Sequence, residues 1–347
     1  MVVKVLRRLL GPLALGVAFV LRPWPQARIN CAHRIRRLKH FRLRIEIERH
    51  FSEQLLAAAP ARGMASLTSG SVISVDTADI IQRSVAVSGA WEPVVSSLME
   101  GLLSEGDSFV DAGANIGYYS LLAAPHIGPT AYFKAIEASP RIFSELKANL
   151  ERNGIDGDVA VHAAVVDGQD FVEVVNVPWP NLGAVMLREV SVELESQVVA
   201  RVPGLSLGEL AAQMPSDRPA VIKIDIEGAE FAARQGIEAL VVHGPSDLAV
   251  LIEVVPDAAA GYAVTRHSDD ETRAHEAIPE NLAQAGGMSL YAVPNSYSPG
   301  GRYPEAIPPL HKLARYDEDV HDYLLIRGEE MAARLEAWMA TTTSLLR

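Results

Sequence analysis

Hydrophobic residues in the middle of the chain alternate between two kinds of pattern. Almost uninterrupted apolar runs, typical of buried strands, cover residues 108–110, 131–136, 159–166, 220–224 and 248–255. Between these runs, apolar residues recur three and four positions apart, as in the stretch from Trp91 to Leu103. This second spacing predicts helices. Strands that alternate with helices indicate an α/β fold built on a parallel sheet.

The pattern changes on either side of this alternating region. Residues 51–70 have a composition typical of a linker, and residues 171–207 predict a hairpin-type insertion beside the sheet. Toward the end of the chain, residues 289–293 and 322–327 predict two further strands. The segment from Glu329 to Leu346 has apolar residues at helical spacing and predicts an amphipathic helix.

The first strand of the alternating region ends in the turn Asp111-Ala-Gly113-Ala-Asn115-Ile-Gly117. Glycine adopts positive φ at little cost and lets a ligand come close to the backbone. The apolar residues that follow predict a helix, whose first turn leaves N–H groups unpaired and carries a partial positive charge. Such a turn is typical of a nucleotide site, and an ordinary strand-to-helix corner is the alternative.

A second acid supports the nucleotide-site interpretation. Glu137 ends the next strand, twenty residues after Gly117, where an acid accepts hydrogen bonds from ribose hydroxyls. The turn lacks the Gly-x-Gly-x-x-Gly pattern of a pyrophosphate site, and Asp111 would repel phosphates but suits a cationic sulfonium. We therefore expect S-adenosylmethionine rather than a dinucleotide. Asp167, after the third strand, either accepts from the adenine amino group or belongs to a turn.

A dense group of acids follows the fourth strand. Three carboxylates lie within the six residues from Asp225 to Glu230, at the sheet edge where ligands bind in open parallel sheets. We predict that Asp225 or Glu227 is a general base, because neighbouring carboxylates raise one another's pKa. Alternatively, Asp225 caps the next helix and Glu230 is only a favourable acid in its first turn. Glu253, near the end of the fifth strand, is the next candidate.

Charge divides the 347-residue chain into a basic arm and an acidic body. Residues 1–50 contain twelve Lys/Arg and two acids, whereas the whole chain has a net charge of −12. The acidic body argues against nucleic-acid binding. The apolar run Leu9–Leu21 is too short to span a bilayer as a helix. It is interpreted as a membrane-surface segment, a signal peptide or a segment packed on the body, and a peripheral membrane contact would involve residues 1–44.

Cysteine and histidine give little indication of metal chemistry, and we predict no metal site. Cys31 is the only cysteine, which excludes an intramolecular disulfide and fits a reducing, cytoplasmic location. A short segment rich in acids and histidines matches no specific ligand spacing; it contains His267, Asp269, Asp270, Glu271 and His275.

Together these motifs are similar to those of the FkbM family of methyltransferases, a branch of the class I S-adenosylmethionine-dependent enzymes. The resemblance rests on four stretches: Phe109–Ser120, Ile136–Pro140, Leu146–Asn149 and, most distinctively, Lys223–Glu230. It covers the chain from about residue 75 to residue 328. Where the family usually has Glu-Pro after the second strand, this chain has Glu137-Ala138, which keeps the carboxylate.

The resemblance implies a Rossmann-like α/β fold with a seven-stranded, mostly parallel sheet, one antiparallel edge strand and helices on both faces. It also implies methyl transfer from S-adenosylmethionine, typically to a hydroxyl of a sugar, a lipid-linked glycan or a natural product. The acceptor is then a small molecule or a glycan. The residues expected at the cofactor are Asp111, Gly113, Asn115, Gly117, Glu137 and Asp167.

Three segments follow from this interpretation: a basic and apolar arm (1–50), a methyltransferase domain (51–328, with its core at about 109–290) and a C-terminal helix (329–347). Two other functions are considered. A membrane-associated binding protein that keeps the fold without catalysis is disfavoured by the intact turn at residues 111–117. A nucleotide-sugar or NAD enzyme is disfavoured by the missing Gly-x-Gly-x-x-Gly.

Overall fold

The computed structural model describes residues 2–36, 47–176, 185–188, 198–254, 277–294, 310–314 and 320–344. The described residues form two compact units, the first within residues 1–96 and the second from residue 97 onward. Helix α6 (Pro93–Leu102) begins in the first unit and ends in the second. The segment that contains His267 and His275 lies outside the described residues.

The first unit is mainly helical. Its elements are α1 (Val2–Val20), α2 (Pro25–Arg36), the π-helical turn η1 (Glu48–Ser52), α4 (Glu53–Ala58), β1 (Arg62–Ser66), β2 (Val72–Asp76) and α5 (Ile80–Ser88). Strands β1 and β2 pair antiparallel. Residues 51–70 are therefore no linker: they contain a helix and a strand, because Leu55 and Leu56 are fully buried.

One face of α1 packs within this unit. Leu10, Ala14 and Ala18 recur every four residues along the helix and are buried in one cluster with Phe51 and Leu55. These last two side chains come from the neighbouring segment η1–α4. No helix among the described residues is long and apolar enough to cross a membrane.

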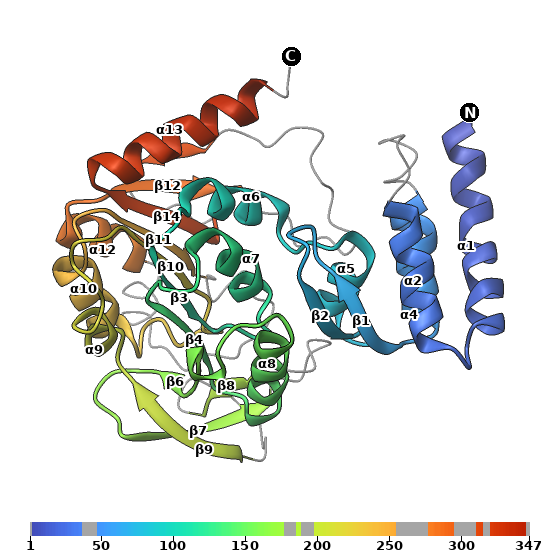
Figure 1. Ribbon diagram of the computed structural model, residues 1–347, viewed down its shortest axis with the longest axis horizontal. Coiled ribbons are helices and arrows are strands. Elements are labelled where there is room, and N and C mark those ends of the chain that lie inside the picture. Colours follow the sequence, from blue (N-terminus) through green and yellow to red (C-terminus); the bar gives the residue numbers. More distant parts are fainter. Residues whose placement is uncertain are drawn as a thin grey trace. The chain divides into compact units, whose positions relative to one another are not determined.

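The second unit is built on an eight-stranded sheet (Figure 1). In spatial order its strands are β13 (His311–Leu313), β12 (Ser289–Val293), β14 (Asp322–Arg327), β11 (Leu248–Glu253), β10 (Ala220–Ile224), β3 (Ser108–Ala112), β4 (Phe133–Glu137) and β5 (Ala160–His162). The five strands from β11 to β5 pair parallel, whereas β14 is antiparallel to both of its neighbours. The mostly parallel, Rossmann-like sheet is thus confirmed.

Two features of the sheet differ from the expectation of seven strands with an antiparallel edge strand. Strand β14 is not at the edge, since it lies between β11 and β12. An additional strand, β13, pairs antiparallel with β12 at the edge. It has only three residues and no apolar run that would have indicated it.

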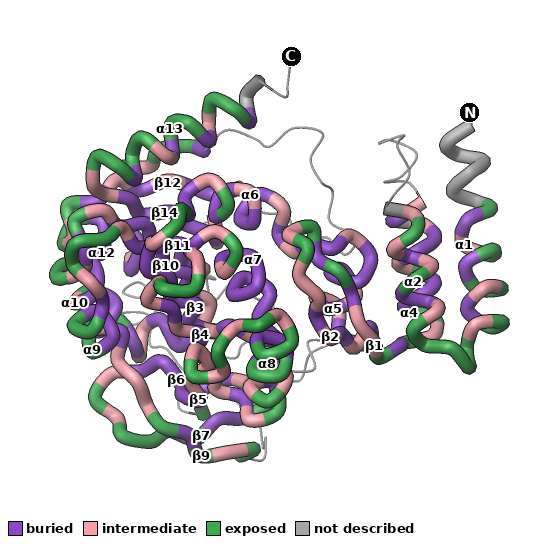
Figure 2. Tube along the Cα trace, viewed as in Figure 1, coloured by how far each residue is buried: buried purple, intermediate pink, exposed green. Residues whose placement is uncertain are grey.

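Helices cover both faces of this sheet (Figure 1). Helices α7 (Tyr118–Ile127) and α8 (Pro140–Arg152) lie on one side, and α9 (Leu207–Ala211), α10 (Arg234–His243) and α12 (Ile278–Gly286) lie on the other. The last three share one apolar core with the strands. Figure 2 shows the central strands as buried along their length, which explains their uninterrupted apolar sequences.

The expected C-terminal helix is α13 (Glu329–Ser344). Met331, Leu335 and Trp338 are buried on one of its faces. Arg334, on the same helix, forms an ion pair with the buried carboxylate of Asp107, just before β3. The helix is therefore an integral part of the second unit.

A second, smaller sheet contains β6 (Ala164–Val165), β9 (Val198–Leu205), β7 (Phe171–Asn176) and β8 (Val185–Leu187), in that order. Strand β7 pairs antiparallel with both β9 and β8, which confirms the hairpin-type insertion. The strand expected over 159–166 is divided, because β5 joins the main sheet and β6 joins the smaller one.

Candidate functional site

The carboxyl ends of neighbouring strands bring most of the predicted site residues together. Strand β3 lies between β10 and β4, and the register pairs Asp111 with Lys223. Beyond the last paired residues, the N–H of Asp225 donates to the carbonyl of Ala112 at 2.9 Å. Three parts of the site therefore share one edge of the sheet: the turn after β3, Glu137 at the end of β4, and the turn after β10. This last turn, residues 225–230, is hereafter the acidic turn.

The turn after β3 lies directly against the backbone of the acidic turn. Gly113 has φ 83°, and its N–H donates to the carbonyl of Ile136 at 3.0 Å. A Cβ at residue 113 would lie 1.7 Å from the carbonyl oxygen of Asp225. Any side chain here would collide with backbone, so glycine is what lets the two turns touch. At the other end of the turn, Gly117 is the N-cap of α7.

Glu137 connects the end of β4 to this turn. Its carboxylate accepts hydrogen bonds from the N–H of Asn115 at 3.0 Å and from the N–H of Ser139 at 2.7 Å. Burial raises the pKa of Glu137 to about 7, although these two hydrogen bonds lower it. Asn115 also has positive φ, at 49°, and its side-chain oxygen accepts from the N–H of Ile116. Each Glu137 oxygen can still accept a second hydrogen bond.

Asp111 is held inside the protein. It is 1% exposed and accepts a hydrogen bond from Ser120 Oγ at 2.6 Å. Burial raises the pKa of its carboxyl to about 6, whereas the Ser120 hydrogen bond and the charge of Lys223 lower it. The Lys223 Nζ, itself buried, lies 3.7 Å from Asp225 Oδ2. The buried Lys223 therefore offsets the negative charge of both Asp111 and Asp225.

The acidic turn after β10 has a strained backbone. Glu227 has φ 53° and Gly228 has φ 87°. Positive φ is uncommon for a residue with a side chain and is often associated with functional sites. Glu230 is buried, and its carboxylate accepts from the N–H of Gly228 at 3.3 Å.

The helix after this turn begins later than the sequence suggested. Helix α10 starts at Arg234, and its N-cap is Ala233. Glu230 is therefore not in its first turn, and Asp225 does not cap it, so both structural alternatives for these acids are wrong. The positive φ of Glu227 and Gly228 keeps these two residues out of a right-handed helix, and residues 230–233 form a turn before α10 begins.

The carboxylates of the acidic turn shift one another's protonation. Desolvation raises the pKa of Asp225, as do the charges of Asp322 and Glu230, while Lys223 lowers it. Glu227 is exposed as a residue, yet desolvation of its carboxyl and the neighbouring charges raise its pKa to about 8. A carboxylate whose pKa lies near neutrality is suited to accept a proton from a reacting group.

Apolar residues of the acidic turn pack against two hydrophobic cores. Ile226 contacts both the main core and a second core formed by the smaller sheet. Ala229 is buried in that second core with Val174 and Val202, from β7 and β9. The hairpin-type insertion therefore helps to fix the position of the acids.

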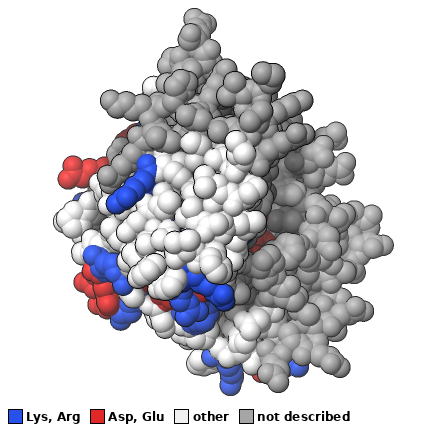
Figure 3. All heavy atoms as spheres, turned by 90° about the vertical axis from the view of Figure 1, so that its right-hand side faces the viewer, with Lys and Arg blue, Asp and Glu red and all other residues white. Residues whose placement is uncertain are grey.

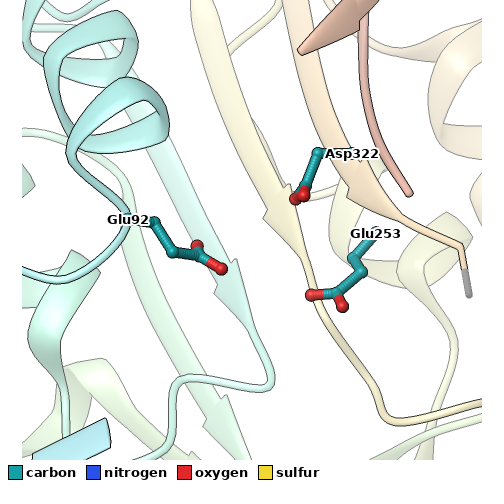
Figure 4. Close-up of side chains that lie close together, drawn as sticks. All are labelled: Glu92, Glu253 and Asp322. Carbon is teal, nitrogen blue, oxygen red and sulfur yellow. The ribbon is translucent and has the colours of Figure 1, made fainter. Parts of the chain in front are cut away.

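Two further acids lie at the same edge, one strand beyond β10. Glu253 ends β11 and is paired in register with Asp322, the first residue of β14. Figure 4 shows both side chains where their strands meet; Glu92, drawn with them, belongs to the first unit. Glu253 was expected here, but nothing in the sequence indicated Asp322, because its position depends on the insertion of β14 beside β11.

Asp167 holds the first residues of α10 in place. Its carboxylate accepts from the N–H of Gln235 at 2.7 Å and from the N–H of Gly236 at 2.9 Å, at the start of α10. Ser206 Oγ donates to the same group at 3.3 Å. Asp167 follows β6 of the smaller sheet rather than a strand of the main sheet. Its binding to the cofactor stays a prediction.

Two buried polar residues support the site but were not among the predicted site residues. Asn149, fully buried on α8, donates from Nδ2 to the carbonyl of Ile116 at 2.8 Å and so fixes the turn after β3. Lys223 is the other. Their sequence signal is similar: each is a polar residue placed within an otherwise apolar pattern, Asn149 beside Leu150 and Lys223 within an apolar strand.

The site fits S-adenosylmethionine, which supplies an activated methyl group on a cationic sulfonium. The N-terminus of α7 follows the turn from Gly113 to Gly117. Glu137 would accept hydrogen bonds from the ribose hydroxyls, and the acids at the same edge favour a cation. Asp111, enclosed by Ser120 and Lys223, would act through its charge rather than by direct contact.

The sheet order, the turn after β3 and the acid that ends β4 are those expected of a Rossmann-like, class I S-adenosylmethionine-dependent methyltransferase. Residues 111–244 match the family model described as the Methyltransferase FkbM domain. The chain therefore contains an FkbM methyltransferase domain, with S-adenosylmethionine as its cofactor, and the expected resemblance is confirmed. No curated protein matches the chain.

Several solved structures are similar in fold. An O-methyltransferase from Bacillus cereus in complex with SAH shares 10% identity (68% of this chain and 80% of that one covered, TM-score 0.37). The O-methyltransferase TomG from Streptomyces achromogenes in complex with SAM also shares 10% (68% and 79%, TM-score 0.36). Aeropyrum pernix fibrillarin with bound S-adenosyl-L-methionine shares 12% (77% and 98%, TM-score 0.35). These similarities are too low to add to the family assignment.

Proposed function

We propose that this protein is an O-methyltransferase, which transfers the methyl group of S-adenosylmethionine to a hydroxyl of a sugar, a glycan or a related natural product. One observation carries the proposal. The turn expected to hold the cofactor, residues 111–117, is in backbone contact with a strained turn whose exposed acid, Glu227, has a pKa raised to about 8. A group suited to accept a proton therefore lies beside the expected methyl donor.

Positioning of the acceptor is the first task of the protein in this proposal. Methyl transfer requires the acceptor oxygen to approach the methyl carbon from the side opposite the sulfur. Alignment of this kind contributes ~7–11 kcal/mol in ideal cases. The acidic turn is fixed by Ile226 and Ala229 in their apolar cores, which limits its movement. Carboxylates at this edge would accept hydrogen bonds from the other hydroxyls of a polyol acceptor.

Proton removal is the second task. As the new oxygen–methyl bond forms and the bond to sulfur breaks, the hydroxyl proton of the acceptor passes to a carboxylate of the acidic turn. Glu227 is favoured over Asp225 because it is exposed, whereas Asp225 is half-buried and has Lys223 as an ionic partner. A general base of this kind contributes about 10²–10⁴-fold to the rate.

The test uses the purified full-length chain, methyl-labelled S-adenosylmethionine and a set of hydroxylated acceptors, including simple sugars and a glycan fraction from host cells. We expect a labelled methyl ether. Glu227→Gln should lower turnover by about a hundredfold or more, and Glu238→Gln, at an exposed position on α10, is the matched control.

Label on nitrogen or sulfur would contradict O-methylation and leave the methyltransferase assignment intact. Absence of transfer, together with unchanged melting temperature on adding the cofactor, would support the non-catalytic alternative. If Glu227→Gln and Asp225→Asn both retain normal turnover, the base lies elsewhere, and Glu253 becomes the candidate.

A further inference from the structure

Exposed apolar side chains are concentrated on helix α1 and in the turn that follows it. Among the described residues, six of the ten large hydrophobic side chains that are exposed lie there: Leu9, Leu13, Leu15, Phe19, Val20 and Trp24. Phe19 is 80% exposed. Scattered exposed hydrophobic residues are normal, whereas a contiguous group on one helix indicates an interaction surface.

This surface, hereafter the apolar face of α1, is distinct from the face that packs inside the first unit. Leu10, Ala14 and Ala18 occupy the packed face, against Phe51 and Leu55. The helix therefore has apolar residues on both sides, and among the described residues of the unit only the packed side is covered. Figure 3 looks at the side of the molecule where α1 lies and shows a mainly uncharged surface with basic and acidic side chains near its edges.

The sequence on both sides of the apolar run is basic. Lys4, Arg7 and Arg8 precede the apolar run, Arg22 follows it, and no acid occurs before Glu46. An apolar helical face combined with basic residues and a terminal tryptophan is the composition of helices that bind at a membrane interface. Basic residues near an anionic lipid surface are attracted to it.

We propose that the apolar face of α1 inserts into the headgroup region of an anionic lipid bilayer, with the helix parallel to the membrane surface. The packed face of α1 is occupied by Phe51 and Leu55, so lipid can reach the helix from one side only. A second copy of the chain is the other candidate occupant. It is disfavoured because pairing two such faces would bring the basic residues of both helices together.

The test is sedimentation of the full-length chain with vesicles of phosphatidylcholine, with and without phosphatidylserine. We expect binding to the anionic vesicles, weakened by salt. The double variant Leu13→Glu/Phe19→Glu should reduce this binding about tenfold or more. Its control is Phe171→Glu/Val242→Glu, which adds the same charge at exposed apolar positions of the second unit and should bind normally. Melting temperatures verify that both variants are folded.

The proposal is overturned if the full-length chain does not bind anionic vesicles, or if both double variants bind equally well. It is also overturned if sedimentation equilibrium shows a dimer that Leu13→Glu/Phe19→Glu dissociates, because a second copy then covers the face. None of these outcomes depends on the methyl acceptor, so the membrane proposal and the proposed catalytic function can fail separately.

Discussion

The turn after β3 and the turn after β10 touch each other but differ in how their acids are used. At the first turn, Asp111 accepts from Ser120, and Glu137, which ends β4, accepts from two backbone N–H groups. In the second turn, Glu227 is exposed, and desolvation of its carboxyl and the neighbouring acids raise its pKa. In the proposed function, the first turn therefore binds the cofactor, whereas the second supplies a carboxylate for proton transfer.

Backbone conformation is similar in the two turns. Each has a residue with a side chain at positive φ, Asn115 at 49° in the first and Glu227 at 53° in the second. Glycine occupies the position where the first turn approaches the other backbone most closely, Gly113. Positive φ at a residue with a side chain costs on the order of 1–3 kcal/mol, so both turns are locally strained.

Gly113→Val should have the largest effect, because it affects both turns. The added Cβ would lie 1.7 Å from the Asp225 carbonyl oxygen, and the residue would also have unfavourable positive φ. We expect loss of measurable S-adenosylmethionine binding by calorimetry, together with a lower melting temperature. Gly287→Val is the control, since Gly287 has φ 61° but open space around it. If both variants bind the cofactor equally well, the contact between the turns is unimportant.

Glu137→Ala should affect binding in the first turn while leaving the acidic turn intact. Hydrogen bonds to a charged acceptor contribute on the order of 1.5–3 kcal/mol, so cofactor affinity should fall more than tenfold. Isothermal calorimetry of Glu137→Ala beside the exposed-site variant Glu238→Ala measures this difference. An unchanged dissociation constant would remove Glu137 from the cofactor site.

These two turns were the part of the molecule that the sequence predicted best. Their glycines and acids have local causes, since a strand end and a helix start determine what the turn between them must contain. The turn residues Gly113 and Gly117, and Glu137 at the end of β4, lie where the sequence analysis placed them. The start of α8 also has a local cause, because Ser139 caps the helix and Pro140 is its first residue.

The features that the sequence did not reveal depend on partners far apart in the chain. Asp167 holds the start of α10 through residues 68 and 69 positions away, which no local pattern encodes. Asp322 lies beside Glu253 only because β14 is inserted between β11 and β12. Composition alone also does not specify the turn at residues 230–233, which delays the start of α10 to Arg234.

Stability should decrease as pH rises, if the acids of the two turns have the shifted pKa values derived above. Glu137 and Glu227 have folded-state pKa values of about 7 and about 8, above their ordinary value of 4.5. Their contribution to folding is therefore complete below about pH 4.5 and is lost as pH rises through 7 and 8. Chemical unfolding between pH 5 and pH 9 should show this decline, and the decline should be smaller in Glu137→Gln/Glu227→Gln.

Asp167→Asn should have the smallest effect and separates helix capping from cofactor binding. Loss of a helix-capping carboxylate costs about 1 kcal/mol, which urea unfolding can measure. Cofactor affinity should remain unchanged, in contrast to Glu137→Ala. A tenfold loss of affinity with unaltered stability would instead place Asp167 at the adenine, as the sequence pattern allowed.

The division between a binding turn and a catalytic turn is tested most directly by the pH dependence of kcat for the wild-type chain and Glu227→Gln. The wild-type rate should rise with pH, pass through half its maximum near pH 8 and level off above that pH, because the carboxylate must be unprotonated to act as a base. Glu227→Gln should lose this rise and about a hundredfold or more in rate, with its S-adenosylmethionine Kd unchanged. A Glu227→Gln enzyme with the wild-type rate and pH profile would contradict the account.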